Sequence, residues 1–255
     1  YLARCQYLLQ QGRFVADVCR LVPDGGNHGS KPGMAALPGR YATPPDGYNY
    51  DYLSDKTVAQ ATVSNGRITL PSGMSYRVMQ LPEATTMTPE LLRKLSDLVR
   101  AGAIVIGPKP EKSPSLQGYP NCDTDVRSLA AELWGGCDGR TVTEHVLGAG
   151  RVFWGKPMAE VLRATAGGPD VQVVVDPPVN DDAIKSVTLG RGKTMGDEPP
   201  GLMPSKGLNW IHRRAGETEI YFLANPQHRP VEAQCSFRVS GRPPECWDPV
   251  TGGLS

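Results

Sequence analysis

The sequence predicts an α/β protein in which a doubly wound parallel sheet precedes a short antiparallel β segment. Apolar runs alternate with amphipathic helical stretches up to residue 168, as parallel βαβ crossovers require. Near the C-terminus apolar residues recur at every second position, the period of a half-buried strand. We therefore expect an open sheet of flavodoxin-like type over residues 1–168, a loop-rich linker over 169–206 and a partial antiparallel β-sandwich over 207–255.

The first elements are a helix, a short strand and a long loop. Residues 1–11 predict a helix that ends at Gly12, and its apolar face consists of Leu2, Cys5, Leu8 and Leu9. Phe14–Val18 is an apolar run typical of a short buried strand. Residues 22–47 contain eleven glycines and prolines without periodicity, so we expect a loop, and loops of that length are usually functional or disordered.

A hairpin and a strand follow the loop. Asn65-Gly66 separates Ala61–Ser64 from Arg67–Leu70, and this dipeptide between two β-prone runs is the strongest short hairpin signal. Tyr76–Leu81 then predicts a strand.

The next stretch predicts a βαβ unit. Thr88 can cap a helix whose first residue is Pro89, and Gly102 ends it. The apolar stripe of this helix consists of Leu91, Leu92, Leu95, Leu98 and Val99. Ala103–Ile106 is continuously apolar, as a strand covered on both faces must be.

A second such unit ends the α/β region. Asp123 is expected to cap the next helix, and Arg151–Trp154 predicts a strand that follows a tight turn at Gly148–Gly150. A last helix should begin at Pro157 and end at Gly167-Gly168.

The C-terminal region predicts antiparallel β structure. Leu208–Arg214 and Glu219–Ala224 form a hairpin through Ala215-Gly216, and alternation over Ala233–Val239 predicts a further strand. Glu245–Trp247 is a last short strand. About 48 residues are too few to close a sandwich, so we expect this one to be completed elsewhere.

Composition excludes several classes of function. Lysine and arginine number 27 and aspartate and glutamate 26, so the net charge of +1 argues against nucleic-acid binding. No apolar run approaches the ~20 residues of a membrane span. The six cysteines include no C-x-x-C pair, which argues against a zinc ribbon and leaves their disulfide state open. Because the chain begins at Tyr1 without methionine and stops without an obvious finish, we interpret it as part of a longer protein.

No motif identifies a nucleotide, cofactor or metal site. Leu189–Thr194 ends like a P-loop but has Val187 where the first glycine is needed. Cys19 and Ser75 are candidate nucleophiles, although a buried thiol and a turn serine explain them better. None of the histidines that could serve as a base belongs to a motif: His28, His145, His212 and His228.

The most site-like feature is a run of tyrosines around one carboxylate. Tyr48, Tyr50 and Tyr52 could stack on sugar faces, and Asp51 could accept hydrogen bonds from sugar hydroxyls. A tyrosine-rich edge strand explains the same residues, so both interpretations stay open. We take Tyr48, Tyr50 and Asp51 as the candidate substrate-binding residues.

Short segments spread over nearly the whole chain resemble, in order, bacterial α-L-rhamnosidase-like glycoside hydrolases (glycoside hydrolase family 106). These segments are Tyr1–Gly12, Val15–Val18, Gly47–Leu53, Leu70–Arg77, Met87–Arg93, Gly118–Cys122, Gly150–Gly155, Ile211–Arg214, Ile220–Asn225 and Trp247–Gly252. The matching part of the family follows the catalytic barrel and is similar to an amidotransferase-like α/β domain with the start of a β-sandwich.

The resemblance implies an accessory region of a carbohydrate-active hydrolase. The catalytic carboxylates of the family lie in the barrel, so no catalytic residue, metal or cofactor is assigned here. The implied partners are carbohydrate and the catalytic barrel of a parent chain, which would be a secreted or periplasmic bacterial protein. A stand-alone carbohydrate-binding module, an independent small hydrolase and homo-oligomerisation remain alternatives.

Overall fold

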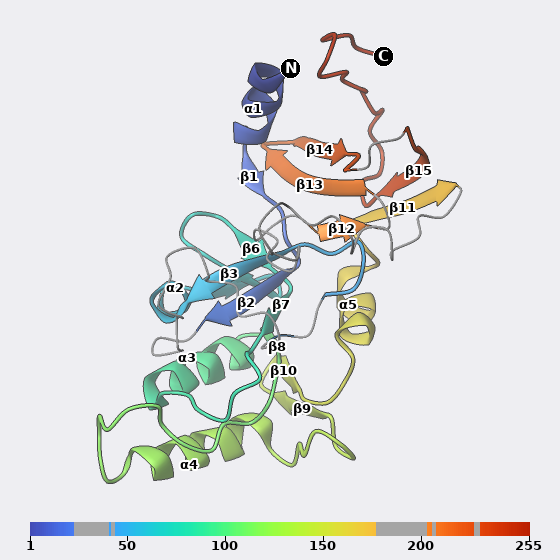
Figure 1. Ribbon diagram of the computed structural model, residues 1–255. Coiled ribbons are helices and arrows are strands. Elements are labelled where there is room, and N and C mark those ends of the chain that lie inside the picture. Colours follow the sequence, from blue (N-terminus) through green and yellow to red (C-terminus); the bar gives the residue numbers. More distant parts are fainter. Residues whose placement is uncertain (23–40, 42–43, 177–202, 206–207, 227–229) are drawn as a thin grey trace, which may run out of the picture.

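The computed structural model describes residues 1–22, 41, 44–176, 203–205, 208–226 and 230–255. They form a parallel sheet flanked by helices and, above it in Figure 1, a second unit of antiparallel strands. The P-loop-like stretch at 189–194 and most of the predicted loop at 22–47 lie outside the described residues.

The α/β unit is built on a six-stranded sheet with the order β3-β2-β7-β8-β10-β9. Five strands are parallel, which confirms the predicted crossovers, and β9 pairs antiparallel with β10 through the tight turn expected at Gly148–Gly150. Within this sheet, β2 comes first along the chain and lies between the second strand, β3, and the third, β7. The strands are β2 (Val18–Val22), β3 (Tyr50–Ser54), β7 (Val78–Gln80), β8 (Ile104–Ile106), β9 (Glu144–Leu147) and β10 (Gly150–Phe153).

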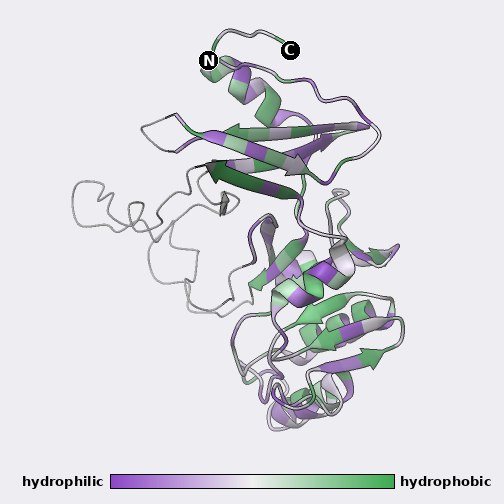
Figure 2. Ribbon diagram, turned by 90° about the vertical axis from the view of Figure 1, so that its right-hand side faces the viewer, coloured by the Kyte–Doolittle hydropathy of each residue, from purple (hydrophilic) through white to green (hydrophobic). Residues whose placement is uncertain are grey.

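Helices cover both faces of this sheet. On one face lie α2 (Asp55–Ala59), α3 (Pro89–Arg100) and α4 (Cys122–Trp134), and on the other lies α5 (Met158–Ala166). Leu92 of α3 and Trp134 of α4 join Met79 of β7 in the larger core, whereas Leu162 of α5 meets Val18. Figure 2 shows the strands between these helices in green, as expected for strands covered on both sides.

The predicted start of α3 is confirmed in detail, and that of α4 is not. Thr88 Oγ1 accepts a hydrogen bond from the backbone N–H of Leu91 at 3.3 Å, and the whole predicted stripe is buried. At α4, Asn121 precedes the helix and Asp123 lies in its first turn. Asp123 Oδ1 accepts the N–H of Ser113 at 2.8 Å, so this carboxylate holds the preceding loop and does not cap the helix.

A small antiparallel sheet lies beside the parallel one. It consists of β4 (Thr62–Ser64), β5 (Arg67–Thr69) and β6 (Ser75–Tyr76). Between β4 and β5, Asn65 has φ of 51° and Gly66 has φ of 69°, the conformation that the Asn-Gly signal predicts.

The second unit consists of two sheets around a core of their own. β13 (Leu208–Ala215) pairs with β14 (Thr218–Ala224) along one side and with β1 (Arg13–Phe14) and β12 (Met203–Ser205) along the other. The second sheet pairs β11 (Val171–Asp176) with β15 (Glu232–Phe237). Apolar residues of both sheets meet between them: Val171, Val173, Val175, Leu208 and Trp210.

The start of the chain belongs to this second unit. Helix α1 (Leu2–Gln10) leads into β1, and Gly12 has φ of 58° between them. A Cβ atom at Gly12 would lie 2.1 Å from the carbonyl oxygen of Arg214. Only glycine therefore lets β1 approach β13 this closely.

The two units of the structure do not follow the domain boundaries that we expected from the sequence. Residues 1–14 pack with the C-terminal sheets and not within a 1–168 domain, and β11 and β12 come from the predicted linker 169–206. Two strands that pair across nearly 200 residues leave no local pattern in the sequence. The change of composition at the linker can therefore be read from the sequence, but the strand that pairs with β1 cannot.

Candidate functional site at the carboxyl edge of the parallel sheet

The order of the strands directs attention to one place on the sheet. The chain steps from β2 to one side, to β3, and then returns to the other side, to β7. In open α/β sheets, ligands bind outside the carboxyl ends of the strands where the order reverses in this way. Here β2 and β7 meet at Arg20 and Gln80, and Arg20 Nε donates to Gln80 Oε1 at 3.0 Å.

Arg20, in the middle of β2, organises a group of tyrosines beside this point of the sheet. Its side chain is buried, and its guanidinium carbon lies 3.8 Å from the centre of the Tyr50 ring. Arg20 Nη1 donates to the hydroxyl of Tyr52 at 3.3 Å, and the rings of Tyr50 and Tyr52 meet edge to face at 5.5 Å. Cation–π contact and hydrogen bonds thus fix an aromatic cluster around one guanidinium, which we call the Arg20 cluster: Arg20, Tyr41, Tyr50, Tyr52 and Gln80.

The three predicted substrate-binding residues do not all lie together. Tyr48 and Tyr50 share the α5 side of the sheet, where Tyr48 is buried in the core and Tyr50 packs against that core and contacts Arg20. Asp51 points to the opposite face, where its Oδ2 accepts the hydroxyl of Tyr76 at 2.8 Å. Neighbours on a strand must face opposite ways, so proximity in sequence did not mean proximity in space. Contact of these three residues with substrate stays a prediction.

Arg20 and Gln80 were not found from the sequence. Both are polar residues in otherwise apolar strands: Arg20 lies in the middle of Val18–Val22, and Gln80 ends Val78–Gln80. A buried arginine requires partners. Its place in a buried strand was therefore a usable signal.

Neither candidate nucleophile is activated. Cys19 is fully buried, and burial together with the nearby charge of Asp51 raises the pKa of its thiol well above the ordinary value. A thiol in that state does not supply a thiolate. Ser75 Oγ accepts Arg67 Nε at 3.0 Å. This serine therefore links β6 to β5. All six cysteines are free.

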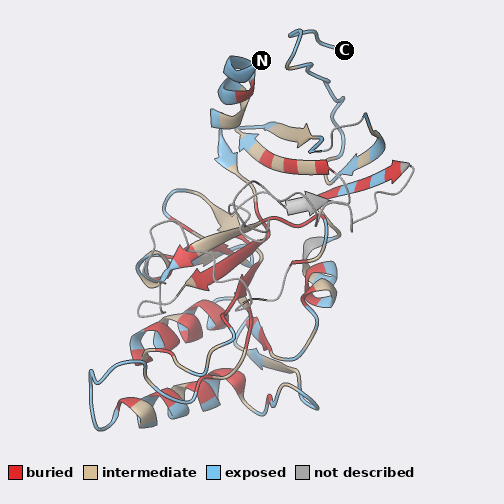
Figure 3. Ribbon diagram, in the orientation of Figure 1, coloured by how far each residue is buried: buried red, intermediate tan, exposed pale blue. Residues whose placement is uncertain are grey.

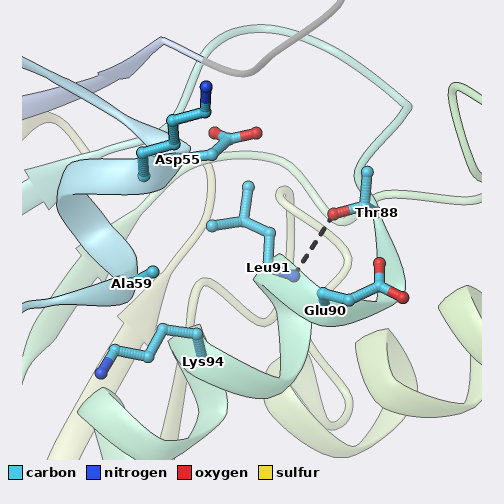
Figure 4. Close-up of a pocket in the computed structure, with 7 residues that line it drawn as sticks. Asp55, Ala59, Thr88, Glu90, Leu91 and Lys94 are labelled. Carbon is cyan, nitrogen blue, oxygen red and sulfur yellow. Dashed lines mark hydrogen bonds between the residues drawn. The ribbon is translucent and has the colours of Figure 1, made fainter.

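A shallow hollow lies at the same edge on the other face of the sheet (Figure 4). Asp55 and Ala59 of α2 face Thr88, Glu90 and Leu91 at the start of α3 across it. Its volume of about 250 Å³ lies below the roughly 300–1,000 Å³ of most ligand pockets. Two acidic side chains line the hollow together with Lys56 and Lys94, so its charges balance.

The most deeply buried carboxylates lie where the two units meet. Asp17, 1% exposed, precedes β2 and accepts Arg238 Nη2 at 2.9 Å and Arg77 Nε at 3.0 Å. Arg238 follows β15, and its Nη1 also donates to the carbonyl of Gly168 at 2.9 Å. One carboxylate with two arginines therefore joins the parallel sheet to the second unit.

A histidine continues this network into the second unit. His212 Nδ1 lies 2.7 Å from Asp170 Oδ2, and its Nε2 lies 2.8 Å from Glu219 Oε2. Tyr221 stacks on the ring at 4.0 Å between centroids and donates its hydroxyl to Asp170 Oδ1 at 3.0 Å. Burial and Asp170 together raise the pKa of Tyr221 well above its ordinary value, so the phenol stays protonated.

This arrangement is unsuited to glycoside hydrolysis. Paired carboxylates in glycosidases flank the bond that breaks, with space for sugar and water. Between Asp170 and Glu219 stands the ring of His212, which is itself buried. The network therefore has the contacts of a structural joint. Among the described residues, no group of three or more His, Cys, Asp or Glu side chains could hold a metal ion. In that same part of the chain, no helix is long and apolar enough to cross a membrane.

Comparison with known proteins gives a consistent result. A family model described as alpha-L-rhamnosidase, glycoside hydrolase family 106, matches residues 1–188 and 199–255. A protein of Formosa agariphila, provisionally named beta-glucuronidase, is 32% identical over 254 residues, which are 100% of this chain and 18% of that protein. A solved rhamnosidase structure from Novosphingobium sp. PP1Y matches with a TM-score of 0.74 and 30% identity, over 100% of this chain and 21% of the other.

The chain thus spans about a fifth of the length of the relatives it matches, and it corresponds to one region of a larger glycoside hydrolase. The family match covers nearly every residue, including the four sheets that the described residues form and the strands that carry the Arg20 cluster. The resemblance found in the sequence is confirmed, and the chain belongs to the alpha-L-rhamnosidase family, glycoside hydrolase family 106.

Proposed function

We propose that this chain is a non-catalytic, supporting region of an α-L-rhamnosidase-like enzyme, whose bond-breaking residues lie on a catalytic barrel of the parent chain. The proposal rests on the observation that the buried carboxylates are held in ion pairs and hydrogen bonds. Asp17, Asp170 and Glu219 are each paired with an arginine, and the ring of His212 lies between the last two. None of them lines the hollow at the sheet edge.

The α/β unit of this region is, on this proposal, a flavodoxin-like domain of amidotransferase type. The order of its parallel strands supports that assignment, because the first strand lies between the second and the third, as in flavodoxin. Its role would be to brace the barrel. The second unit would be the start of a β-sandwich, and its separate core supports that assignment.

The Arg20 cluster supports a second, compatible role in carbohydrate contact. Tyr50 and Tyr52 lie on one face of β3 beside β2, the strand at which the order of the sheet reverses, and the ring faces of tyrosine suit stacking on sugars. A stand-alone carbohydrate-binding module would use the same rings. Calorimetry with rhamnose-containing oligosaccharides separates the two roles: heat that disappears in Tyr50→Ala would favour the stand-alone module.

A glycosidase assay tests the main proposal. Purified chain is incubated with aryl α-L-rhamnosides and other aryl glycosides, and we expect no turnover above buffer. The strongest rival pair is Asp55 and Glu90, since both line the hollow in Figure 4. Turnover that is lost in Asp55→Asn or Glu90→Gln, but kept in the control Glu83→Gln, would refute the non-catalytic role.

A further inference from the structure

Half of the large exposed apolar side chains in the described residues lie on two short segments. These segments are α1 with the preceding residue Tyr1, and the last eleven residues of the chain. Figure 3 shows both segments mainly in pale blue, the colour of exposed residues. The six side chains are Tyr1, Leu2, Tyr7, Trp247, Val250 and Leu254.

The two segments contact each other and form a groove, which we call the α1–tail groove. Arg4 of α1 donates from Nη1 to the carbonyls of Pro249 at 3.2 Å and Val250 at 2.9 Å. Trp247 pairs with Leu254 in a two-residue bridge, so the tail folds back on itself next to α1. The groove has a volume of about 380 Å³ and is lined by Ala3, Arg4, Tyr7, Leu8, Trp247, Asp248, Pro249 and Gly252.

The polar groups of this groove are already satisfied by the tail itself. The guanidinium of Arg4 donates to the tail carbonyls. The carboxylate of Asp248 accepts the N–H of Val250 at 2.8 Å and the hydroxyl of Thr251 at 2.6 Å. These bonds lower the pKa of Asp248, the hydroxyl of Thr251 contributing most. What the groove offers to a ligand is therefore apolar and aromatic surface.

Such a surface suits a polypeptide better than a sugar. A sugar needs polar groups that fix its hydroxyls, whereas the centres of protein interfaces are rich in tyrosine and tryptophan and poor in charge. Tyr7 is 62% exposed and Trp247 is 52% exposed. Both rings are therefore available as anchors.

The length of the relatives indicates where that polypeptide comes from. The matched region is 18% of one relative and 21% of the other, so each carries about four times as much chain outside it. Whichever end of the matched region that chain joins, it starts beside the groove, because Arg4 holds the first helix against the last residues. Figure 1 shows both termini at the same end of the molecule.

We propose that the α1–tail groove is the surface on which this region docks against the remainder of a larger glycoside hydrolase of its family. The inference rests on the proposed function, since it takes that remainder as the partner. It identifies Tyr7 and Trp247 as the anchors of the interface and Leu2 and Val250 as flanking contacts.

A binding experiment tests this interface with two matched variants. The probe is the Novosphingobium rhamnosidase from which the matched region has been deleted, titrated onto immobilised chain. We expect the wild-type chain and the control Leu116→Ser/Tyr119→Ser to bind alike, because Leu116 and Tyr119 are even more exposed than the anchors but lie elsewhere. Tyr7→Ser/Trp247→Ser should bind at least tenfold more weakly.

Three results would overturn the proposal. They are no binding by the wild-type chain, binding that the anchor variant does not weaken, and self-association or sugar binding that the anchor variant abolishes. A second measurement does not depend on folding of the deleted enzyme. On superposition with the solved rhamnosidase, the positions equivalent to Tyr7 and Trp247 should be covered by its other parts, and equivalents as exposed as here would refute the interface.

The two proposals fail in different ways. Turnover by the chain alone would refute the non-catalytic role and leave the groove untouched. An inactive chain whose groove stays uncovered would refute only the docking surface.

Discussion

Helices α3 and α1 belong to different units of the molecule and differ in how much of their apolar faces is buried. In α3, seven of twelve residues are buried, Thr88 caps the start, and Arg100 lies in the last turn. In α1, Cys5 is the buried residue, and no side chain caps the start. Both helices were expected from apolar residues on one face. Amphipathic spacing therefore predicts a helix, but it does not say whether the partner surface is present.

The largest expected effect comes from the better packed helix. Leu92→Ala removes a fully buried side chain of α3 and should lower the free energy of unfolding by about 3–5 kcal/mol. Leu2→Ala in α1, where the side chain is 73% exposed, should change it by less than about 0.5 kcal/mol. Urea unfolding of both variants measures the difference, and equal losses would break the contrast between the helices.

The joint between the two units should show the next largest effect. Arg238→Met leaves Asp17 buried with only Arg77, and we expect a loss of about 3 kcal/mol, the lower end for a buried pair because Arg238 is partly exposed. The matched change Arg242→Met breaks an exposed pair with Glu217 and should cost less than about 1 kcal/mol. If both variants unfold at the same urea concentration, the joint does not stabilise the molecule.

Capping should contribute less. Thr88→Ala removes the hydroxyl that accepts the N–H of Leu91, with an expected loss of about 1 kcal/mol. Thr88→Ser keeps the acceptor and should stay near wild type. Thermal unfolding followed by circular dichroism compares the two, and an equal fall in Tm for serine would show that the lost methyl group, and not the cap, matters.

The smallest expected effect is a dependence of the stability on pH at two aspartates. Hydrogen bonds lower the pKa of Asp138, first from the Thr141 hydroxyl and then from backbone N–H groups of Arg140 and Val142. A depressed carboxyl pKa stabilises the fold above the unfolded value of ~3.9, and this contribution is lost as the pH falls towards the folded pKa. Asp248 lies in a similar turn, in which a threonine hydroxyl again contributes most but one backbone donor fewer lowers the pKa. Carboxyl NMR titration should place both pKa values below that of a free aspartate, with Asp138 the lower, and a reversed order would contradict this account.

Much of the fold was predictable where the signal is local. The stripe of α3, the Asn65-Gly66 turn and the C-terminal hairpin each depend on residues close in sequence, and the structure has them where the pattern put them. Pairing of β1 with β13, and of β11 with β15, joins segments about 200 and 60 residues apart and was not predicted. No local rule encodes such partners.

In the candidate site too, features that depend on local sequence were predicted and features that depend on long-range pairing were not. The tyrosine-rich strand was found, because aromatic residues on β3 stand out in the sequence. That Tyr50 would lie against Arg20 while Asp51 turned to Tyr76 follows from strand order and pleat. Those two features exist only once the sheet is assembled.

The pairing of the two-residue strand β1 also determines the order in which parts of the chain can fold during synthesis. Strands β2 to β10 with their helices come from an unbroken stretch of chain, so they can assemble while the ribosome is still at work. Arg13 and Phe14 must wait for Arg213 and Arg214 to emerge, some 200 residues later. Ribosome-stalled chains that expose Ala166 outside the ribosome but not yet Arg213 should therefore resist protease at α3 and α4 and be cleaved at α1.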